Sequence, residues 1–333
     1  MAKNDVKVVI NLTTAPGEVR FGVPLIFAGI NDAEKPFTFC YSVEDVKTAG
    51  FAETTEVYKT AQLLFMQDNA PAKIAVCAST GKSVTALPTI WDKDWRQLIV
   101  TSIGTEGEST IDEISDYVES RDQKMYFCHV AATTGASKLA GNERTVCMLY
   151  ASDDYAYPEA ALVGATAGLD PGSFTYKNII LKKLTPQVLS DSEIEAAHTA
   201  NLICFVTKAG DNVTSEGKTC SGEYVDIVDS KDYIIQNIEY RCQKILNKMP
   251  KLPYDNNGIA ALEGETISVL LDAYNNGIIA VNDEGEPDYS VNFAPRSQTS
   301  AADRTKRVYN KGSFTFGLAG AIHNAEITGE IVV

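Results

Sequence analysis

The segment ASTGKSVT at 78–85 carries the residue types of a phosphate-binding loop. Its Gly-Lys-Ser triplet at 81–83 follows the apolar run KIAVCA, which is where backbone amides and a lysine can hold phosphate. Such a loop also needs a glycine five residues before Gly81, where this chain has Val76. It should open directly into a helix, whereas SVTALPTIW is rich in β-branched residues and is interrupted by Pro88. The pattern favours a surface turn, with a nucleotide-binding α/β enzyme as the alternative.

A second glycine-containing stretch, VGATAGLDPGSF, has glycines at 164, 168 and 172. A dinucleotide fingerprint places closely spaced glycines at the first strand-to-helix turn of a βαβ unit. Here the first two glycines fall inside a helical pattern, and the Asp170–Pro171 pair forms a turn after it. The stretch therefore indicates a small-residue helix that packs closely against a neighbour, followed by a tight loop.

Metal-binding and acid–base groups show no stronger pattern. His129, His198 and His323 are far apart, and no CxxC pair occurs. His129 is interpreted as a satisfied core residue, and His198 lies near a helix end, where the dipole favours an imidazole. The acidic pairs at 153–154 and 283–284 fall on turn-like stretches, and no G-x-S-x-G elbow occurs. We expect a protein that is not an enzyme and has no catalytic, cofactor or metal site.

Composition excludes several partners. The 333 residues carry a formal net charge of -15, the opposite of the basic surface that nucleic acid or an anionic membrane would need. No apolar run approaches the roughly 20 residues of a membrane span, and Lys7 and Asn11 interrupt the start too early for a secretory signal. Single cysteines in apolar runs predict buried, reduced thiols and a product of the cytosol. They are Cys40, Cys77, Cys128, Cys147, Cys204, Cys220 and Cys242.

Two clusters of basic residues stand out from the acidic background. One lies at 296–311 with Asp303 as its single acid, and we interpret it as a docking patch for an acidic protein surface. It contains Arg296, Arg304, Lys306, Arg307 and Lys311. The other recurs at helical spacing on one face, where a solvated surface is the simpler interpretation. It contains Arg241, Lys244, Lys248 and Lys251.

The helices and strands that must position these residues show two different patterns along the chain. From about 37 to 206, buried strand patterns alternate with capped helices, which predicts an α/β layer with parallel pairing. One of these helices is expected to be capped by Asp191 or Ser192. After a boundary near 208–216, we expect a hairpin within 209–229, a long helix over 224–248, and a second helix that ends at NNG. The long helix has an apolar stripe of Val228, Ile234, Ile238, Ile245 and Met249.

Both ends of the sequence alternate apolar and polar residues, as amphipathic strands do. The first end places Val6, Val8, Ile10 and Leu12 on one face, and the last places Ile327, Gly329, Ile331 and Val333 on one face. An unpaired strand edge invites another chain to add on. Each strand is therefore expected either to pair within its own domain or to pair with a neighbour.

This order of segments resembles the tail sheath proteins of contractile phages and of phage-tail-like bacteriocins. The resemblance rests on DVKVVINL, an α/β body, ALVGATAGLDPGSFTYKNIILKKLTP, LICFVTKAGDNVTSEGKTCSGEYVDIVDSKDYI, a long helix and AEITGEIVV. It implies an α/β plus α+β fold divided into four parts. These are an N-terminal strand arm and linker at 1–20, an outer sheath body at 21–212, an inner tube-facing domain at 213–322 and a C-terminal strand arm at 323–333.

The resemblance also implies a function. Subunits would polymerise as stacked hexameric rings around a tail tube and contract to drive the tube through a target cell envelope. The implied partners are further copies of the chain, the tube protein, and the baseplate and tail terminator proteins, with no nucleic acid and no membrane as a direct ligand. The particle would be a virion or phage-tail-like particle, synthesised in the bacterial host cytoplasm. The arms would add strands to neighbouring subunits, and Arg304, Lys306 and Arg307 are the tube-facing candidates. A tube protein is the remaining structural alternative, although tube subunits are smaller and mainly β.

Overall fold

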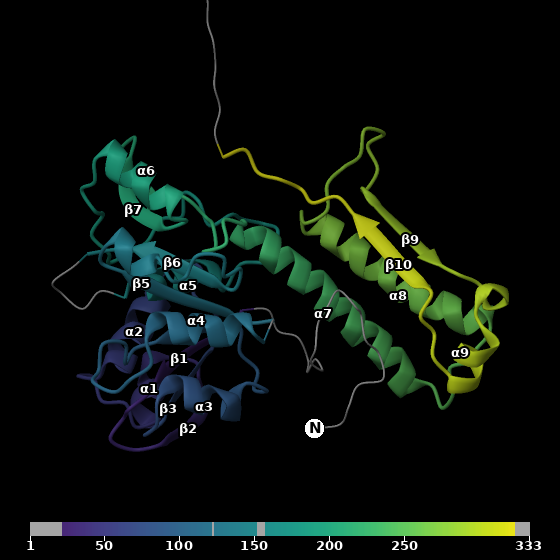
Figure 1. Ribbon diagram of the computed structural model, residues 1–333, viewed down its shortest axis with the longest axis horizontal. Helices are drawn as coiled ribbons and strands as arrows, with labels where there is room; N and C mark the ends of the chain where they lie inside the picture. The colour runs from purple at the N-terminus through teal and green to yellow at the C-terminus, as the bar shows by residue number, and fades with distance from the viewer. Residues whose placement is uncertain (1–21, 122, 152–156, 324–333) are drawn as a thin grey trace, which may run out of the picture.

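The computed structural model describes residues 22–121, 123–151 and 157–323. Within them, an eight-stranded sheet with the order β2-β3-β1-β4-β5-β6-β7-β8 forms the centre of a larger part, which we call the body (Figure 1). The six central strands are parallel and the two edge strands are antiparallel, as predicted for an α/β layer. The strands are β1 (Pro24–Ala28), β2 (Lys35–Cys40), β3 (Ile74–Ala78), β4 (Gln97–Val100), β5 (Met125–Val130), β6 (Thr145–Leu149), β7 (Ile203–Lys208) and β8 (Asp211–Thr214).

Helices cover both faces of this sheet, so the central strands are buried on both sides. Along β1, Leu25 and Phe27 face one core while Ile26 and Ala28 face the other, because successive side chains point to opposite faces. The core around Ile26 is covered by α1 (Val43–Thr48), α2 (Glu56–Phe65) and α5 (Pro158–Thr166). The core around Leu25 is covered by α3 (Ser83–Ile90), α4 (Ile111–Glu119) and α6 (Asp191–Thr199), and a short 3-10 turn, η1 (Thr133–Ala136), adds Ala136.

Gly164 in α5 and Gly168 in the turn after it allow the close packing that the sequence predicted. A Cβ atom on Gly164 would lie 2.4 Å from the Leu64 carbonyl oxygen on α2, and one on Gly168 would lie 2.3 Å from the Asn69 carbonyl oxygen. Neither backbone could accept a side chain without moving apart. The interpretation of this stretch as a closely packed helix is confirmed.

Three local predictions need correction. A helix, α3, begins directly at Ser83 and includes Pro88, so the expected break after 81–83 is wrong. Helix α6 is capped by Ser190, whose hydroxyl and the Glu193 carboxylate form a capping box, and not by either residue that follows it. The hairpin is made by β7 and β8 around a turn at 209–210, so it starts earlier than expected.

The rest of the chain forms a smaller part, in which two helices carry a two-stranded sheet (Figure 1). Its elements are α7 (Val225–Lys248), α8 (Asn256–Asn275), β9 (Tyr289–Phe293), η2 (Arg296–Gln298), α9 (Ala301–Lys306) and β10 (Gly312–Phe316). A third core joins Ile234 and Ile238 of α7 to Val269 and Leu270 of α8. Gly277 follows α8 with φ +81°, which confirms the predicted left-handed ending.

Helix α7 links the two parts physically. Its first turns place Val228 in the core around Ile26, and its later turns place Ile234 and Ile238 in the third core. A helix of this length spans about 36 Å, so one rigid element serves both. The predicted apolar stripe ends before Met249, which is exposed at the end of the helix.

Candidate functional site

The Gly-Lys-Ser loop joins β3 to α3, and a carboxylate from a neighbouring loop occupies its polar groups. The Oε1 atom of Glu34 accepts hydrogen bonds from the Thr80 amide at 2.8 Å and the Thr80 hydroxyl at 2.9 Å. It also accepts one from the Ser79 hydroxyl at 3.1 Å. These bonds, with the Thr80 amide contributing most, lower the pKa of Glu34. A phosphate approaching this turn would meet a negative charge.

A second carboxylate occupies the start of α3. The Oε1 atom of Glu108 accepts from the Ser83 amide at 2.7 Å and from the Ser109 amide at 2.6 Å, and its Oε2 atom accepts from the Ser102 hydroxyl at 3.0 Å. The Val84 amide donates to the Ser109 hydroxyl at 3.1 Å. The first two amides of α3, which a helix start could offer to phosphate, are therefore already bonded to side chains of this chain. This arrangement disfavours the nucleotide-binding alternative. It also explains why a helix can begin at Ser83 despite the β-branched residues that follow, because Glu108 and Ser109 accept hydrogen bonds from its first two amides.

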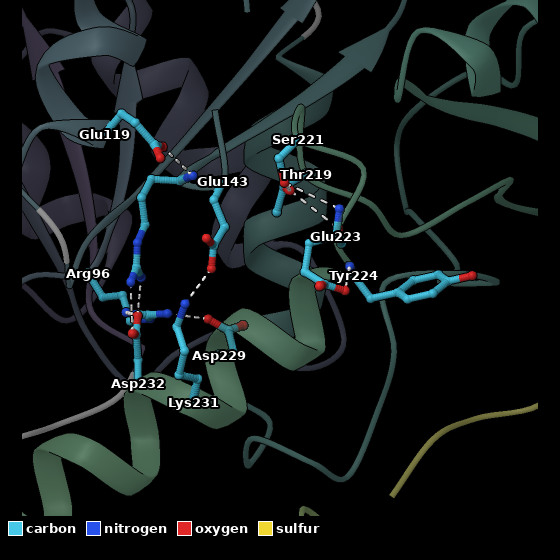
Figure 2. Close-up of polar contacts among 11 residues, drawn as sticks. Arg96, Glu119, Glu143, Thr219, Ser221, Glu223, Tyr224, Asp229, Lys231 and Asp232 are labelled. Atoms are coloured by element: carbon cyan, nitrogen blue, oxygen red, sulfur yellow. Dashed lines mark hydrogen bonds and ion pairs between the residues drawn. The ribbon is translucent and has the colours of Figure 1, made fainter. Parts of the chain in front are cut away.

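The most elaborate polar site lies where α7 meets the body, a place that we call the junction (Figure 2). Arg96 and Arg144 come directly before β4 and β6, so the parallel strands bring both guanidinium groups to one edge of the sheet. Both groups bind Asp232 of α7, Arg96 through Nη1 at 2.8 Å and Arg144 through Nη2 at 3.0 Å. Arg96 also pairs with Asp229, whose other oxygen accepts from the Tyr176 hydroxyl at 3.0 Å.

The junction is almost completely withdrawn from water. The side chains of Arg96, Arg144 and Asp232 are 4%, 3% and 0% exposed. Burial alone would raise the pKa of Asp232, but the charges and hydrogen bonds of the two arginines outweigh it and hold that pKa below its usual value. Because each charge is matched, removing one member would leave the others buried without a partner.

Less buried pairs surround this centre. Lys231 pairs with Glu143, and the Arg144 amide donates to Glu119 at 2.8 Å (Figure 2). The sequence analysis missed the junction entirely. The available signals were an arginine directly before each of two apolar strands, and two aspartates three residues apart on the apolar side of the long helix.

The structure separates the three basic candidates near α9. Arg304 is half-buried and donates to the carbonyl and the hydroxyl of Thr299, which ties α9 to the turn before it. Lys306 and Arg307 are exposed. On the helical stripe, Arg241 pairs with Asp272 of α8, whereas Lys244, Lys248 and Lys251 are exposed.

The histidines have separate environments. His129 Nδ1 lies 2.7 Å from Glu159 Oε2, and His198 Nε2 lies 2.9 Å from the Ser215 hydroxyl, while His323 lies against Tyr224. In the part of the chain that the structure describes, no cluster of three or more His, Cys, Asp or Glu residues could hold a metal ion. Among the same residues no helix has the length and apolar character to cross a membrane. All seven cysteines are free and buried, as predicted.

The predicted arm residues and the acidic pair at 153–154 lie outside the described ranges. They are Val6, Val8, Ile10 and Leu12 of the first arm, and Ile327, Gly329, Ile331 and Val333 of the second.

Comparison with known proteins identifies the fold. No protein-family model and no curated protein sequence matches the chain. Among solved structures, the helical sheath of the anti-feeding prophage in its contracted state is 14% identical, with a TM-score of 0.72 over 98% of this chain and 99% of that one. The contracted sheath complex of an extracellular contractile injection system, PVC, is 12% identical, with a TM-score of 0.68 over 98% of each chain. A chain of the six-fold symmetrised anti-feeding prophage baseplate is 13% identical, with a TM-score of 0.69 over 98% of this chain and 99% of that one.

These likenesses extend over nearly the whole length of both chains in each pair. The chain therefore has the fold of contractile sheath subunits, and the α/β plus α+β class expected from the sequence is confirmed.

Proposed function

We propose that this protein is a structural subunit of a contractile sheath. Its subunits polymerise as stacked hexameric rings around a tail tube and contract to drive the tube through a target cell envelope. The observation that carries the proposal is the match along 98% of the chain to a helical sheath in its contracted state. The satisfied amides of the Gly-Lys-Ser loop support a structural role over a nucleotide-using enzyme.

In this proposal the four parts divide the work. Residues 21–212 form the outer body and 213–322 the inner domain that faces the tube, while the arms at 1–20 and 323–333 pair with neighbouring subunits. Strand addition supplies main-chain hydrogen bonds for affinity and alternating side-chain positions for register. A head-to-tail contact whose rotation does not close generates a helical assembly, as a stacked sheath requires.

The partners follow from the same proposal. They are further copies of this chain, the tube protein, and the baseplate and tail terminator proteins, within a virion or phage-tail-like particle made in a bacterial cytoplasm. The exposed charges of Lys306 and Arg307 support a weak, breakable contact with an acidic tube surface. Arg304 supports that surface by holding α9 in place.

Electron microscopy of the purified full chain tests the proposal directly. We expect helical tubes above a critical concentration, and loss of those tubes on deletion of 326–333 with the circular-dichroism spectrum of the folded subunit retained. A full chain that stays monomeric at high concentration, under conditions where its fold is intact, would contradict self-assembly.

A further inference from the structure

The last described residues lead from the smaller part back to the body (Figure 1). After β10, the Ala319 amide donates to the Ile278 carbonyl at 2.9 Å, so this point belongs to the smaller part. Four residues later, His323 contacts the connection between β8 and α7. Four residues span at most about 14 Å, so the segment 319–323 is a short strap between the two parts.

The His323 ring occupies a defined place on the body. It meets the Tyr224 ring edge to face, with the ring centroids 4.7 Å apart and an interplanar angle of 86°. Its Nδ1 atom lies 3.5 Å from Glu216 Oε1, and its side chain is only 12% exposed. Burial raises the pKa of the nearby Asp226, and the neighbouring His323 opposes that rise.

The platform under this ring is itself held firmly. Tyr224 is the N-cap residue of α7, and its amide donates to Glu223 Oε1 at 2.9 Å (Figure 2). The Glu216 carboxylate accepts from the Gly217 amide at 3.1 Å and lies 4.0 Å from the Lys177 ammonium. By contrast, the strap residue before the histidine, Ile322, is 89% exposed. The strap is thus secured at its end by one side chain.

We propose that His323 is a positioning residue that fixes the point from which the predicted C-terminal arm starts. By doing so it pre-organises the predicted C-terminal strand for pairing with a second copy of this chain. A segment that starts from a fixed point loses less conformational freedom when it binds, so less of the binding free energy is spent on ordering it. The strap itself is independent of the proposed function, whereas its consequence for assembly rests on that function.

A spin label tests the strap without any assembly. A nitroxide on the thiol of the Ile322→Cys variant reports local motion, and selective labelling is feasible because the seven native cysteines are buried. We expect a restricted signal from this variant and a several-fold shorter correlation time when His323→Ala is added. His323→Phe should restore most of the restriction, because a phenyl ring can keep the edge-to-face contact with Tyr224.

Assembly of the full chain tests the consequence. The critical concentration for tube formation, measured by light scattering, should rise about tenfold in His323→Ala, which corresponds to about 1.4 kcal/mol. His323→Phe should lie close to the unsubstituted protein. Ile322→Ala is the matched control, and its exposed side chain predicts no change.

The outcomes separate the two ideas. If His323→Ala leaves the nitroxide signal restricted, or if His323→Phe is as mobile as the alanine variant, the ring contact does not secure the strap and the proposal is overturned. An unchanged critical concentration in His323→Ala overturns its role in assembly. If the unsubstituted chain forms no tubes while the spin label responds as expected, the strap stands and the proposed function fails.

Discussion

The body and the smaller part bury their strands in different ways. In the body, the central strands are covered on both faces, and β3 and β6 are buried at every position. In the smaller part, β9 and β10 alternate between half-buried and exposed residues, because one face packs on the helices and the other faces outward. The outer edges of this two-stranded sheet have no strand beside them among the described residues. The central strands of the body are thus covered within one chain, whereas each strand of the smaller sheet is an edge strand that could pair with a further strand.

The junction connects these two differently packed parts. A marginal two-stranded sheet needs packing against a helix for stability. Helix α8 supplies that packing, and α7, which packs against α8, is bound to the body by matched buried charges at its first turns. The smaller part can therefore keep a two-stranded sheet with unpaired edges, because α7 is anchored to the body at the junction.

The largest expected effect comes from breaking the junction. Asp232→Ala leaves two buried arginines with less compensation, so the free energy of unfolding should fall by about 3–5 kcal/mol in urea titrations. Glu53→Gln, which removes an exposed partner of Lys47, is the control and should leave that free energy nearly unchanged. A loss of under 1 kcal/mol in Asp232→Ala would mean that the junction does not anchor α7.

A pH titration of stability examines a second buried charge of the body. Lys124 donates to the Lys93 carbonyl at 3.0 Å and the Trp95 carbonyl at 2.6 Å, and burial lowers its pKa to about 7. The pKa of a lysine in the unfolded chain is about 10.4, so between pH 7 and 10 the unfolded state binds the extra proton. Stability should therefore rise with pH across this window, by up to about 1.4 kcal/mol per pH unit, and be lowest below it.

Lys124→Met isolates this contribution. The difference between the two stability curves should show the slope, since the other titrating groups are common to both proteins. Parallel curves for the two proteins would show that this lysine stays charged in the folded state.

Two glycine substitutions compare the packing of the two parts. Gly164→Ala in α5 places a Cβ against the α2 backbone and should destabilise by about 1–3 kcal/mol. Gly264→Ala in α8 meets no atom within 4 Å and should stabilise by about 0.5–1 kcal/mol, because alanine favours a helix. Thermal melts of both variants give the comparison, and effects of equal sign would mean that α5 and α8 do not differ in this way.

The smallest effect on stability is expected at the basic surface. Lys306→Glu with Arg307→Glu should change the free energy of unfolding by less than about 0.5 kcal/mol, since both side chains are exposed. Co-sedimentation with the tube protein should nevertheless decrease, if the proposed function is right. Unaltered co-sedimentation would remove these two residues from the tube contact.

Much of the fold could be predicted because its signals are local. Strands such as IAVCA are apolar at every position, and the helix start at Thr110 carries a capping box. The glycine at 277 marks a helix end whose left-handed conformation costs other residues free energy. These features depend on residues within a few positions of one another, so the local sequence is enough to predict them.

The sequence by itself therefore determined the α/β class, the sequential order of most elements and the burial of the thiols. Only the tertiary structure decided which charges are matched. Arg96 and Asp232 are 136 residues apart, and Ser83 meets Glu108 only because two loops converge at one end of the sheet. The start of α3 and the anchoring of α7 depend on such distant partners. Charged groups are stabilised by the groups that surround them in space, and the periodicity of the sequence does not predict which distant groups those are.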